Sequence, residues 1–433
     1  MTLTIILSII GILGMLLCIF KFPNVKIKNH IFDTFYLPIL IVAIIFLIFP
    51  IFDKTELFNI LFSNSKLNPL KILVLFISIS FISITLDEAG FFSYIAVKFI
   101  NRFKANQYTL FLSLYVLISI LTIFTSNDIV ILTFTPFILY FSKRGNINPI
   151  PFLIMEFVAA NTYSMLLPIG NPTNIYLSSI FELDFVTYLS KMVLPTLFVG
   201  IASILILLLL FHKELNKKIE VFDDKPVHIH NLFICIVSLI HLALTTILLV
   251  ISNYINIEMW IIALSFGISL LLFITIYGII KKNHLYISRP IRRLPYTLIP
   301  FILSMFVIIM ALESFDVFSI IHNLFENIEN QNTKEITYLV ASTLSCNLVN
   351  NIPMTIAFGS ILQGTENTTV IYATIIGSNL GAILSPVGAL AGIMWMRILQ
   401  QNDVDYGFTK FVKNGSIITI ALLLASGIAL LII

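Results

Sequence analysis

The stretch "CNLVNNIPMTIAFG" at residues 346–359 decides the fold, because it places Asn347, Asn350, Asn351 and Pro353 inside a run otherwise apolar enough for a membrane. The hydrocarbon of a bilayer penalises unsatisfied polar groups and broken helix backbone heavily. Such backbone is tolerated only where it is buried in protein or lines a cavity. The stretch therefore predicts the tip of a re-entrant hairpin inside a membrane protein.

Composition places the rest of the chain in a membrane as well. Of its 433 residues, 58% are hydrophobic and only 11% are charged, whereas a surface in water needs far more charge. Apolar stretches of about 20 residues, the length that crosses a bilayer, recur from end to end. We therefore predict an all-α polytopic membrane protein. The first run, residues 3–20, lacks a basic segment before it and a cleavage site after it, which predicts a retained span and not a signal peptide.

The apolar stretches predict about ten transmembrane helices. These cover residues 3–20, 37–52, 70–98, 150–181, 185–212, 231–252, 258–280, 297–320, 369–398 and 415–433. Two further segments, 107–142 and 335–363, are too long for one crossing and carry polar residues at their centres. We predict that each is a re-entrant hairpin that returns to its own side. The alternative, in which both cross fully, gives twelve spans.

The positive charges orient this arrangement. With ten crossings and two hairpins, about four fifths of the 25 Lys and Arg residues fall on one side, which the positive-inside rule makes cytoplasmic. Both termini are then outside, hairpin 107–142 enters from the cytoplasm and hairpin 335–363 enters from outside. The twelve-span alternative puts Lys143 and Arg144 on the face opposite Lys98, which scrambles the bias.

The chain also contains an internal repeat. "ANTYSMLLPIGN" (160–171) aligns without a gap with "SNLGAILSPVGA" (378–389). The alignment pairs Asn161 with Asn379, Pro168 with Pro386, and Gly170 with Gly388. Upstream of the two copies lie the polar tips "TSND" (125–128) and "VNN" (349–351), and upstream again the acid pairs in "DEAGFF" (87–92) and "ESFDVF" (313–318). The same order of features therefore occurs twice.

The repeat divides the chain into two halves of five crossings each. Because five is odd, the second half enters the membrane in the opposite sense, which is an inverted-topology repeat. We predict a first repeat at 1–212, a cytoplasmic linker at 213–230 and a second repeat at 231–433. Many secondary transporters have this architecture and bind substrate near the midplane at discontinuous helices.

The hairpin tips carry the strongest candidates for substrate binding. They are Ser126, Asn127 and Asp128 on the first tip, with Asn350 and Asn351 on the second. Helix ends at such tips expose backbone N–H groups and carbonyls that can hold ions or polar solutes. The alternative is that these residues only cap the hairpin helices. Matching tips in both halves favour a site.

The stretch "PIGNPTN" (168–174) cannot be continuous helix, because it contains two prolines and a glycine. A simple kink is the alternative, but a kink does not need polar groups that lipid penalises. The residues predicted to bind substrate here are Asn171, Pro172, Thr173 and Asn174. The second copy, "SPVGALAG" (385–392), is less polar, so Gly388 and Ala389 are expected to contribute backbone carbonyls and close approach.

Carboxylates inside a membrane are expensive and indicate function. Asp128 is the first candidate for proton or cation coupling, because it lies on a tip. Further coupling candidates are Asp87, Glu88 and Glu313. For Asp87 and Glu88 the alternative is pairing with a buried donor that holds helices together. Glu156, about one turn into its span, and Asp316, near the end of its span, have an interfacial position as the alternative.

No motif indicates enzyme chemistry, ATP hydrolysis, a metal or a cofactor. HExxH, GxSxG and phosphate-cradling Gly loops are absent from the sequence. Cys18, Cys235 and Cys346 are scattered and predict neither disulfides nor zinc. No predicted span has Arg or Lys near its middle, which weakens an organic-anion substrate unless bound sodium supplies the positive charge. Energy is expected to come from an ion gradient or from a partner subunit.

Taken together, the motifs resemble the ion transporter superfamily, most closely its arsenite/antimonite efflux permeases and the related sodium/proton antiporters. The resemblance rests on "LDEAGFF" (86–92), "SNDIVILTFTP" (126–136), "NPTNI" (171–175), "LVNNIPM" (348–354) and "GSNLGAILSPVGALAGIMWMRIL" (377–399). It implies a scaffold part and a transport part, efflux of As(OH)3-like solutes against protons, and a homodimer. The sodium-coupled dicarboxylate symporters of this superfamily carry Ser-Asn-Thr on both tips, whereas this chain has Ser-Asn-Asp at 126–128 and Val-Asn-Asn at 349–351. This departure favours the arsenite or cation branch.

The leading prediction is a plasma-membrane transporter for proton-coupled efflux of arsenite-like solutes by alternating access. The alternatives are a sodium-coupled di- or tricarboxylate or inorganic anion symporter, and a sodium/proton antiporter. An intramembrane enzyme is disfavoured, because its only nucleophile–base pair, Ser126 with Asp128, lies two residues apart on a tip. A membrane scaffold without transport does not need polar breaks in both halves. The expected partners are a small solute, H⁺ or Na⁺, the lipid bilayer, a second copy and an optional ATPase subunit, with no nucleic acid.

Overall fold

The computed structural model describes residues 1–433 except 23, 28–29, 50, 63–67, 104–105, 220–227, 253, 366 and 433. Part of the predicted linker and Lys28, Lys66, Lys104 and Lys225 of the charge count therefore lie outside the described residues. The described chain is helical apart from one antiparallel hairpin of β1 (Asn24–Ile27) and β2 (His30–Asp33).

The helices of the first half and its flanks are α1 (Thr2–Lys21), α2 (Leu37–Ile48), α3 (Lys54–Phe62), α4 (Pro69–Glu88), α5 (Phe91–Phe103), α6 (Gln107–Phe124), α7 (Asn127–Arg144), α8 (Ile150–Tyr163), the short 3₁₀ helix η1 (Pro168–Gly170), α9 (Pro172–Ile180) and α10 (Phe185–Leu215). Those of the second half are α11 (Leu232–Val250), α12 (Met259–Ile280), α13 (Leu285–Arg292), α14 (Leu298–Glu313), α15 (Val317–Glu326), α16 (Gln331–Val349), α17 (Asn351–Ile361), α18 (Thr368–Leu384), η2 (Pro386–Gly388), α19 (Leu390–Gln401) and α20 (Phe408–Leu430). Asparagine caps many of them: the Asn106, Asn231 and Asn367 side chains each accept a bond from a first-turn backbone N–H.

The prediction of a polytopic helical membrane protein is confirmed. Among the described residues, seven helices are long and apolar enough to cross a bilayer, or eight if the bent pair α14–α15 is one span. Three shorter apolar helices, α2, α8 and α18, account for most of the difference from ten. The spans predicted at 150–181 and 369–398 are each two helices joined by a 3₁₀ turn, so neither passes as one long helix. The count of ten and the re-entry of the two hairpins stay predictions.

Two other predicted spans are broken where the sequence was read as continuous. The span 70–98 divides into α4 and α5 at Gly90, whose φ of 89° favours glycine. The span 297–320 divides into α14 and α15, which meet at 77°. The acid pairs therefore mark a break in each half, and Asp87 and Glu88 lie in the last turn of α4.

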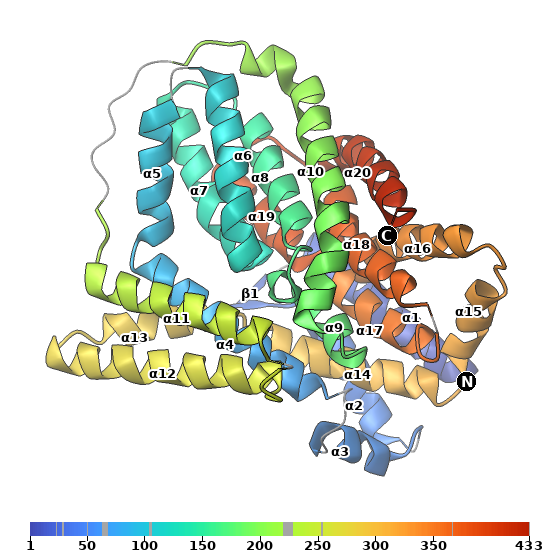
Figure 1. Ribbon diagram of the computed structural model, residues 1–433. Helices are drawn as coiled ribbons and strands as arrows, with labels where there is room; N and C mark the ends of the chain where they lie inside the picture. Colours follow the sequence, from blue (N-terminus) through green and yellow to red (C-terminus); the bar gives the residue numbers. More distant parts are fainter. Residues whose placement is uncertain are drawn as a thin grey trace.

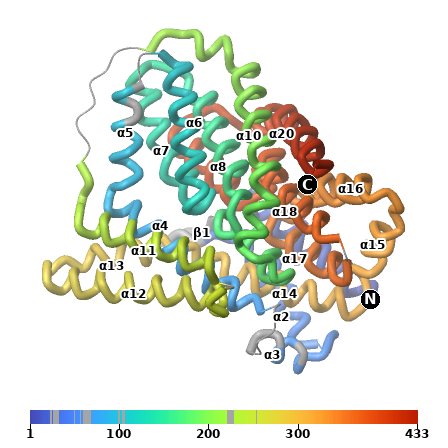
Figure 2. The backbone as a smooth tube through the Cα atoms, viewed as in Figure 1, coloured from blue at the N-terminus to red at the C-terminus, as the bar shows by residue number. Residues whose placement is uncertain are grey.

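The helices form two groups (Figure 1). The lower group in this view contains α2, α4, α11, α12 and α14, and the upper group contains α6, α7, α8, α10 and α16–α20. In the tube view α5 leads from the end of α4 up to the upper group, and α15 leads from α14 to α16 in the same way (Figure 2). Direct contact between the groups comes largely from α9 on α4 and from α17 on α14.

The packing of the two halves is reciprocal. Helix α9 of the first half packs against α17 of the second, and α19 of the second packs against α7 of the first. Likewise α6 packs on α8 and α16 packs on α18. These pairs follow the order that the repeat predicts, although the division at 212 and 231 remains a prediction.

Several polar contacts join loops that are far apart in sequence. These are Lys71 Nζ to Glu258 Oε2 at 2.7 Å, Arg397 Nη1 to Asp33 Oδ1 at 2.6 Å, and the Tyr108 hydroxyl to the His212 carbonyl at 3.0 Å. Each contact joins segments that the charge bias assigns to one side of the membrane. Which side is cytoplasmic stays a prediction.

The outer helices present apolar side chains outward, as a protein in lipid must. In α10 and α12, Leu209 and Ile280 are each 70% exposed, and Ile276 is 58% exposed. In the apolar stretch of α4, in contrast, 78% of the residues are buried, although this helix is almost equally apolar. Helix α4 therefore lies inside the protein, and α10, α11 and α12 lie at its edge.

Candidate functional site

The two copies of the Pro-x-Gly motif fold alike. In each, extended backbone at one residue precedes the 3₁₀ turn (Leu167, φ −117° and ψ 149°; Ser385, φ −146° and ψ 159°). In each, an extended residue follows it and begins the next helix (Asn171, φ −151° and ψ 141°; Ala389, φ −149° and ψ 154°). The repeat seen in the sequence is therefore a repeat of backbone shape, a broken helix in both halves.

The glycines of these turns are required by close packing. A Cβ at Gly170 would clash with the carbonyl of Ser164, and one at Gly388 would clash with the carbonyl of Gly381. Each turn thus folds back onto the last turn of the helix before it. At Gly388 the close approach is therefore between two segments of the chain, and its contribution to substrate binding stays a prediction.

Asn379 on α18 is the hub of a buried polar network. Its Oδ1 accepts hydrogen bonds from Ser164 Oγ at 2.9 Å and from Asn171 Nδ2 at 3.0 Å. Its Nδ2 donates to Asn174 Oδ1 at 2.8 Å and to the Ile375 carbonyl at 2.8 Å. All four bonding positions of this amide are therefore used, and the broken helix of the first half is tied to α18 of the second.

The neighbouring side chains extend this network. Ser378 Oγ donates to Thr173 Oγ1 at 3.0 Å, and Asn174 Nδ2 donates to the Ser164 carbonyl at 2.8 Å. Asn171 also caps α9, since its Oδ1 accepts from the Thr173 N–H at 3.2 Å. All of these residues are at most 1% exposed. Three of the residues predicted here, Asn171, Thr173 and Asn174, are thus brought together.

Sequence reasoning missed Ser164, Ser378 and Asn379 as members of this network. The signal for Asn379 was present, because the repeat aligns it with Asn161. An amide repeated inside two apolar helices needs a partner in both. Ser164 and Ser378 gave no such signal, since serine is common in apolar helices and can bond to its own backbone.

The first hairpin tip faces α8. Asn127 is the first residue of α7, and its Nδ2 donates to Asn161 Oδ1 at 3.1 Å. Ser126 Oγ and Asn127 Oδ1 are buried and have no hydrogen-bond partner within the described chain. Buried acceptors without a donor are costly and rare, so these two atoms are the best candidates to bind a polar solute.

The second tip faces the turn η2. Asn350 has a φ of 78°, and its Nδ2 donates to the Val387 carbonyl at 2.9 Å while its Oδ1 caps α17. Asn351 begins α17 and is 3% exposed. Behind the tip, Ser385 Oγ donates to Asn347 Oδ1 at 2.6 Å. Each tip therefore contacts the broken helix of its own half.

Asp128 lies in the first turn of α7 and is half-buried. Within the described residues it has neither a hydrogen-bond nor an ion-pair partner. The N-terminus of a helix favours a negative charge, while burial disfavours it. Of the candidate coupling carboxylates, this one alone belongs to a tip.

Asp87 and Glu88 belong to a different cluster. Arg293, just after α13, places Nη2 2.7 Å from Asp87 Oδ2 and Nη1 2.7 Å from Glu88 Oε1. Thr133 of α7 also donates to Asp87, at 3.2 Å. The alternative interpretation, pairing with a donor that holds helices together, describes this geometry. The donor was missed because it lies 205 residues further along, in a segment read as a loop.

Breaking this cluster is expected to destabilise the protein. Arg293→Gln should lower the free energy of unfolding by about 1–2 kcal/mol, because Asp87, 8% exposed, loses its cation while Arg293 is partly solvated. Thermal unfolding of the purified protein measures it. The double variant Asp87→Asn/Arg293→Gln should recover part of the loss. The control is Lys217→Gln, which removes the cation of the more exposed ion pair with Glu214. Equal unfolding midpoints for Arg293→Gln and Lys217→Gln would contradict the expectation.

Glu313 and Asp316 lie apart from the network too. Glu313 ends α14 and accepts from Ser360 Oγ on α17 at 3.4 Å. Asp316 sits at the bend before α15 with a φ of 55°. Neither residue is brought to the tips.

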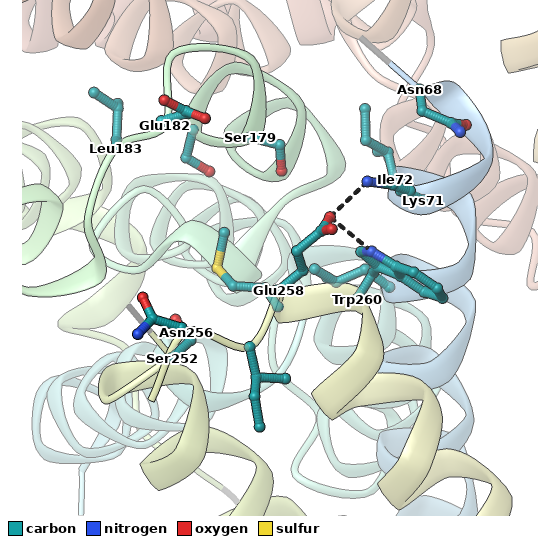
Figure 3. A pocket seen from close by; sticks show the side chains of 14 residues that line it. Asn68, Lys71, Ile72, Ser179, Glu182, Leu183, Ser252, Asn256, Glu258 and Trp260 are labelled. Carbon is teal, nitrogen blue, oxygen red and sulfur yellow. Dashed lines mark hydrogen bonds and ion pairs between the residues drawn. The ribbon is translucent and has the colours of Figure 1, made fainter. Parts of the chain in front are cut away.

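A large cavity of about 610 Å³ opens between α4, α9 and the start of α12 (Figure 3). Within it, Lys71 Nζ and Trp260 Nε1 both donate to Glu258 Oε2, at 2.7 and 2.9 Å. Desolvation works against the charged form of Glu258, but these bonds outweigh it and hold its pKa below the usual value. Ser178 on the opposite wall donates to the Asn174 carbonyl at 2.6 Å, so the cavity ends one helical turn from the network.

Broken helices in both halves, polar tips and a buried amide hub between the halves define a membrane transporter. In agreement, the chain matches the citrate transporter family (CitMHS) over residues 5–375 and belongs to it. This family membership confirms the resemblance to the ion transporter superfamily, and it makes the chain a transporter and not an enzyme.

Several similar curated proteins are described as arsenical pump membrane proteins. The chain is 27% identical over 362 residues to a "Putative arsenical pump membrane protein" of Bacillus subtilis, covering 78% of this chain and 81% of that one. It is 25% identical over 371 residues to an "Arsenical pump membrane protein" of Escherichia coli, covering 82% and 84%. It is also 30% identical to the "P protein" of Mus musculus, over 151 residues and only 18% of that protein.

Proposed function

We propose that this transporter exports arsenite-like neutral solutes by proton-coupled alternating access. The candidate solute ligands are the tip residues Ser126 and Asn127 together with the amide network around Asn379. Asp128 is the proposed titrating group beside them. The similarity to arsenical pump membrane proteins supports this substrate class, as does the chemistry of the site.

The observation that carries this proposal is the neutral character of the tip network. Its side chains are amides and hydroxyls. Two arginines of the second half are already paired with carboxylates: Arg293 with Asp87, and Arg397 with Asp33. A trihydroxide offers three O–H donors, which suit the free acceptors Ser126 Oγ and Asn127 Oδ1. A citrate-like trianion needs cations instead.

Capture of arsenic by three thiolates is not available to this chain. Cys346 is fully buried and directs its thiol toward the Ser378 carbonyl at 3.7 Å. Cys18 and Cys235 lie on α1 and α11, away from the tips. Hydroxyl and amide ligands therefore remain for the solute.

The second candidate function is sodium-coupled citrate or dicarboxylate uptake. The description of the matched family favours it. Here bound sodium has to supply the positive charge that the network lacks. Sodium dependence and the direction of transport separate the two functions, and a sodium/proton antiporter would move sodium without either solute.

Transport in everted vesicles under an imposed proton gradient tests the proposal. Arsenite, sodium and citrate are offered in parallel. Accumulation of arsenite is expected to need the gradient and to fall at least tenfold in Asp128→Asn, because that variant cannot release a proton. Asp403→Asn, at an exposed residue whose φ of 57° suits asparagine, is the control. Sodium-driven citrate uptake that survives Asp128→Asn would reject the proposal.

The reciprocal packing of α9 on α17 and α19 on α7 supports alternating access, since movement of one half shifts the other. We further propose a cell-membrane location with both termini outside, a homodimer, and the repeat limits given above. The alternative source of energy is an ATPase subunit that docks on the basic loops. Labelling of single cysteines placed at Thr2 and Ile432 from either side of the membrane would test the location of the termini.

A further inference from the structure

Glu156 is a buried carboxyl that the proposed transport site does not use. It lies on α8 and is 0% exposed, so other helices cover it completely. The Thr135 hydroxyl on α7 is 3.1 Å from both Glu156 carboxyl oxygens. On the other side lies Trp395 of α19, close enough for its indole N–H to interact with the carboxyl.

The lengths of the hydrogen bonds around Glu156 favour a protonated carboxyl. Thr135 Oγ1 also lies 2.6 Å from the Ile131 carbonyl, which can only accept, so the single hydroxyl hydrogen belongs to that shorter bond. The Thr135 oxygen is then an acceptor toward Glu156, and the carboxyl must donate. Trp395 Nε1 has no hydrogen-bond partner among the described residues, so its N–H is free to interact with the neighbouring carboxyl of Glu156.

Within the described residues Glu156 has no ion-pair partner. On the helices packed around α8, the charged and titratable groups are Asp128, Lys143 and Arg144 at the two ends of α7, Lys191, His212, Lys213 and Glu214 on α10, and Arg397 on α19. Arg397 pairs with Asp33, and Arg144 stacks on Tyr140 at 5.0 Å. The neighbouring tyrosines donate elsewhere: Tyr115 to the Gly200 carbonyl and Tyr188 to the Met165 carbonyl. Tyr372 of α18 stacks on Tyr188.

The position of Glu156 connects it to the tip. Along α7, eight residues separate Thr135 from Asn127, which is about 12 Å of helix. Along α8, five residues separate Glu156 from Asn161, about 7.5 Å. The contacts Asn127–Asn161 and Thr135–Glu156 thus join α7 and α8 at two levels. Helix α19 lies beside the second of them, at Glu156.

We propose that Glu156 is a proton-binding site, neutral in this conformation and separate from Asp128. When α19 withdraws from α8 during transport, water reaches the carboxyl, its O–H bond breaks and the proton passes to water. The inference rests on the proposed proton coupling for its role in transport, but the protonation of Glu156 stands by itself. Thr135, Glu156 and Trp395 come from α7, α8 and α19, so protonation of the site depends on the contact between the two halves.

Infrared difference spectroscopy tests the protonation directly. The spectrum of the wild-type protein minus Glu156→Gln at neutral pH is expected to contain the carbonyl band of one carboxylic acid. Loss of carboxylate bands in its place would overturn the proposal. In Asp403→Asn, the exposed control, the carboxylic acid band should remain. Thr135→Val should shift the band, because the carboxyl loses its acceptor.

Tryptophan fluorescence checks that the substitution leaves the packing intact. The chain has two tryptophans, so in a Trp260→Phe background the emission comes from Trp395 alone. A buried-type emission retained in Glu156→Gln shows that α19 still covers α8. Should Glu156→Gln fail to fold, Thr135→Val in the same background supplies the shifted band without removing the acid.

Transport separates this inference from the proposed function. In Glu156→Gln the ratio of proton-driven accumulation to solute exchange without a gradient is expected to fall at least tenfold, because glutamine cannot release a proton. An unchanged ratio would overturn the role of Glu156 in coupling. If the wild-type protein shows no proton-driven accumulation, the proposed function fails, while the infrared result still decides whether Glu156 is protonated.

Discussion

Asn379→Ala is expected to abolish transport and to destabilise the protein. The substitution removes an acceptor from Ser164 and Asn171 and a donor from Asn174, all of them buried. A buried polar group left without a partner costs about 1–3 kcal/mol, so the free energy of unfolding should fall by at least about 2 kcal/mol. Transport of the solute should fall at least tenfold, because α9 is no longer tied to α18. Vesicle transport and thermal unfolding measure the two effects.

The control is the same substitution at an amide outside the network. Asn402 follows α19, is exposed, and donates only to the Ile398 carbonyl. Asn402→Ala is expected to change the unfolding midpoint and the transport rate little. If both alanine variants behaved alike, the network would not be the joint between the two halves.

Gly388→Ala is expected to prevent the second broken helix from forming. Its Cβ would clash with the carbonyl of Gly381, which is backbone and cannot rotate away. Overpacking against side chains costs about 1–3 kcal/mol, and a clash with backbone belongs at the upper end or beyond, so we expect a loss of about 3 kcal/mol. The fraction of monodisperse protein in size-exclusion chromatography and the unfolding midpoint would show it.

Gly407 provides the matched control for that substitution. It precedes α20, has a φ of −84°, and a Cβ there would meet nothing within 4 Å. Gly407→Ala should therefore fold like the wild-type protein. Equal unfolding midpoints for the two alanine variants would contradict the expectation, because they would show that η2 can accommodate a Cβ at residue 388.

Much of the fold could be predicted, because lipid restricts the chain so strongly. Length and apolarity located the helices, and prolines located the breaks at 168–174 and 385–392. The breaks at Gly90 and Asp316 were missed, since a single glycine or aspartate within an apolar run does not by itself interrupt a helix.

The pairing of side chains could not be predicted to the same degree. Arg293 forms ion pairs with Asp87 and Glu88 because α13 packs against α4. Nothing in the local sequence of either segment indicates this packing. The environment of Glu156 could not be predicted either, since position along a helix does not reveal which helices cover it. Its neighbours are Thr135 of α7 and Trp395 of α19, a helix that begins more than 200 residues later.

The distance in sequence between the partners of the amide hub has a consequence for biosynthesis. Asn171 and Asn379 are 208 positions apart. At roughly 5–20 residues per second, about 10–40 s pass between translation of the first and of the second. During that interval Asn171 Nδ2, Thr173 Oγ1 and Asn174 Oδ1 lack the groups on α18 to which they are bonded in the folded protein. We therefore expect an insertase or a membrane chaperone to shield these groups from lipid until α18 leaves the ribosome.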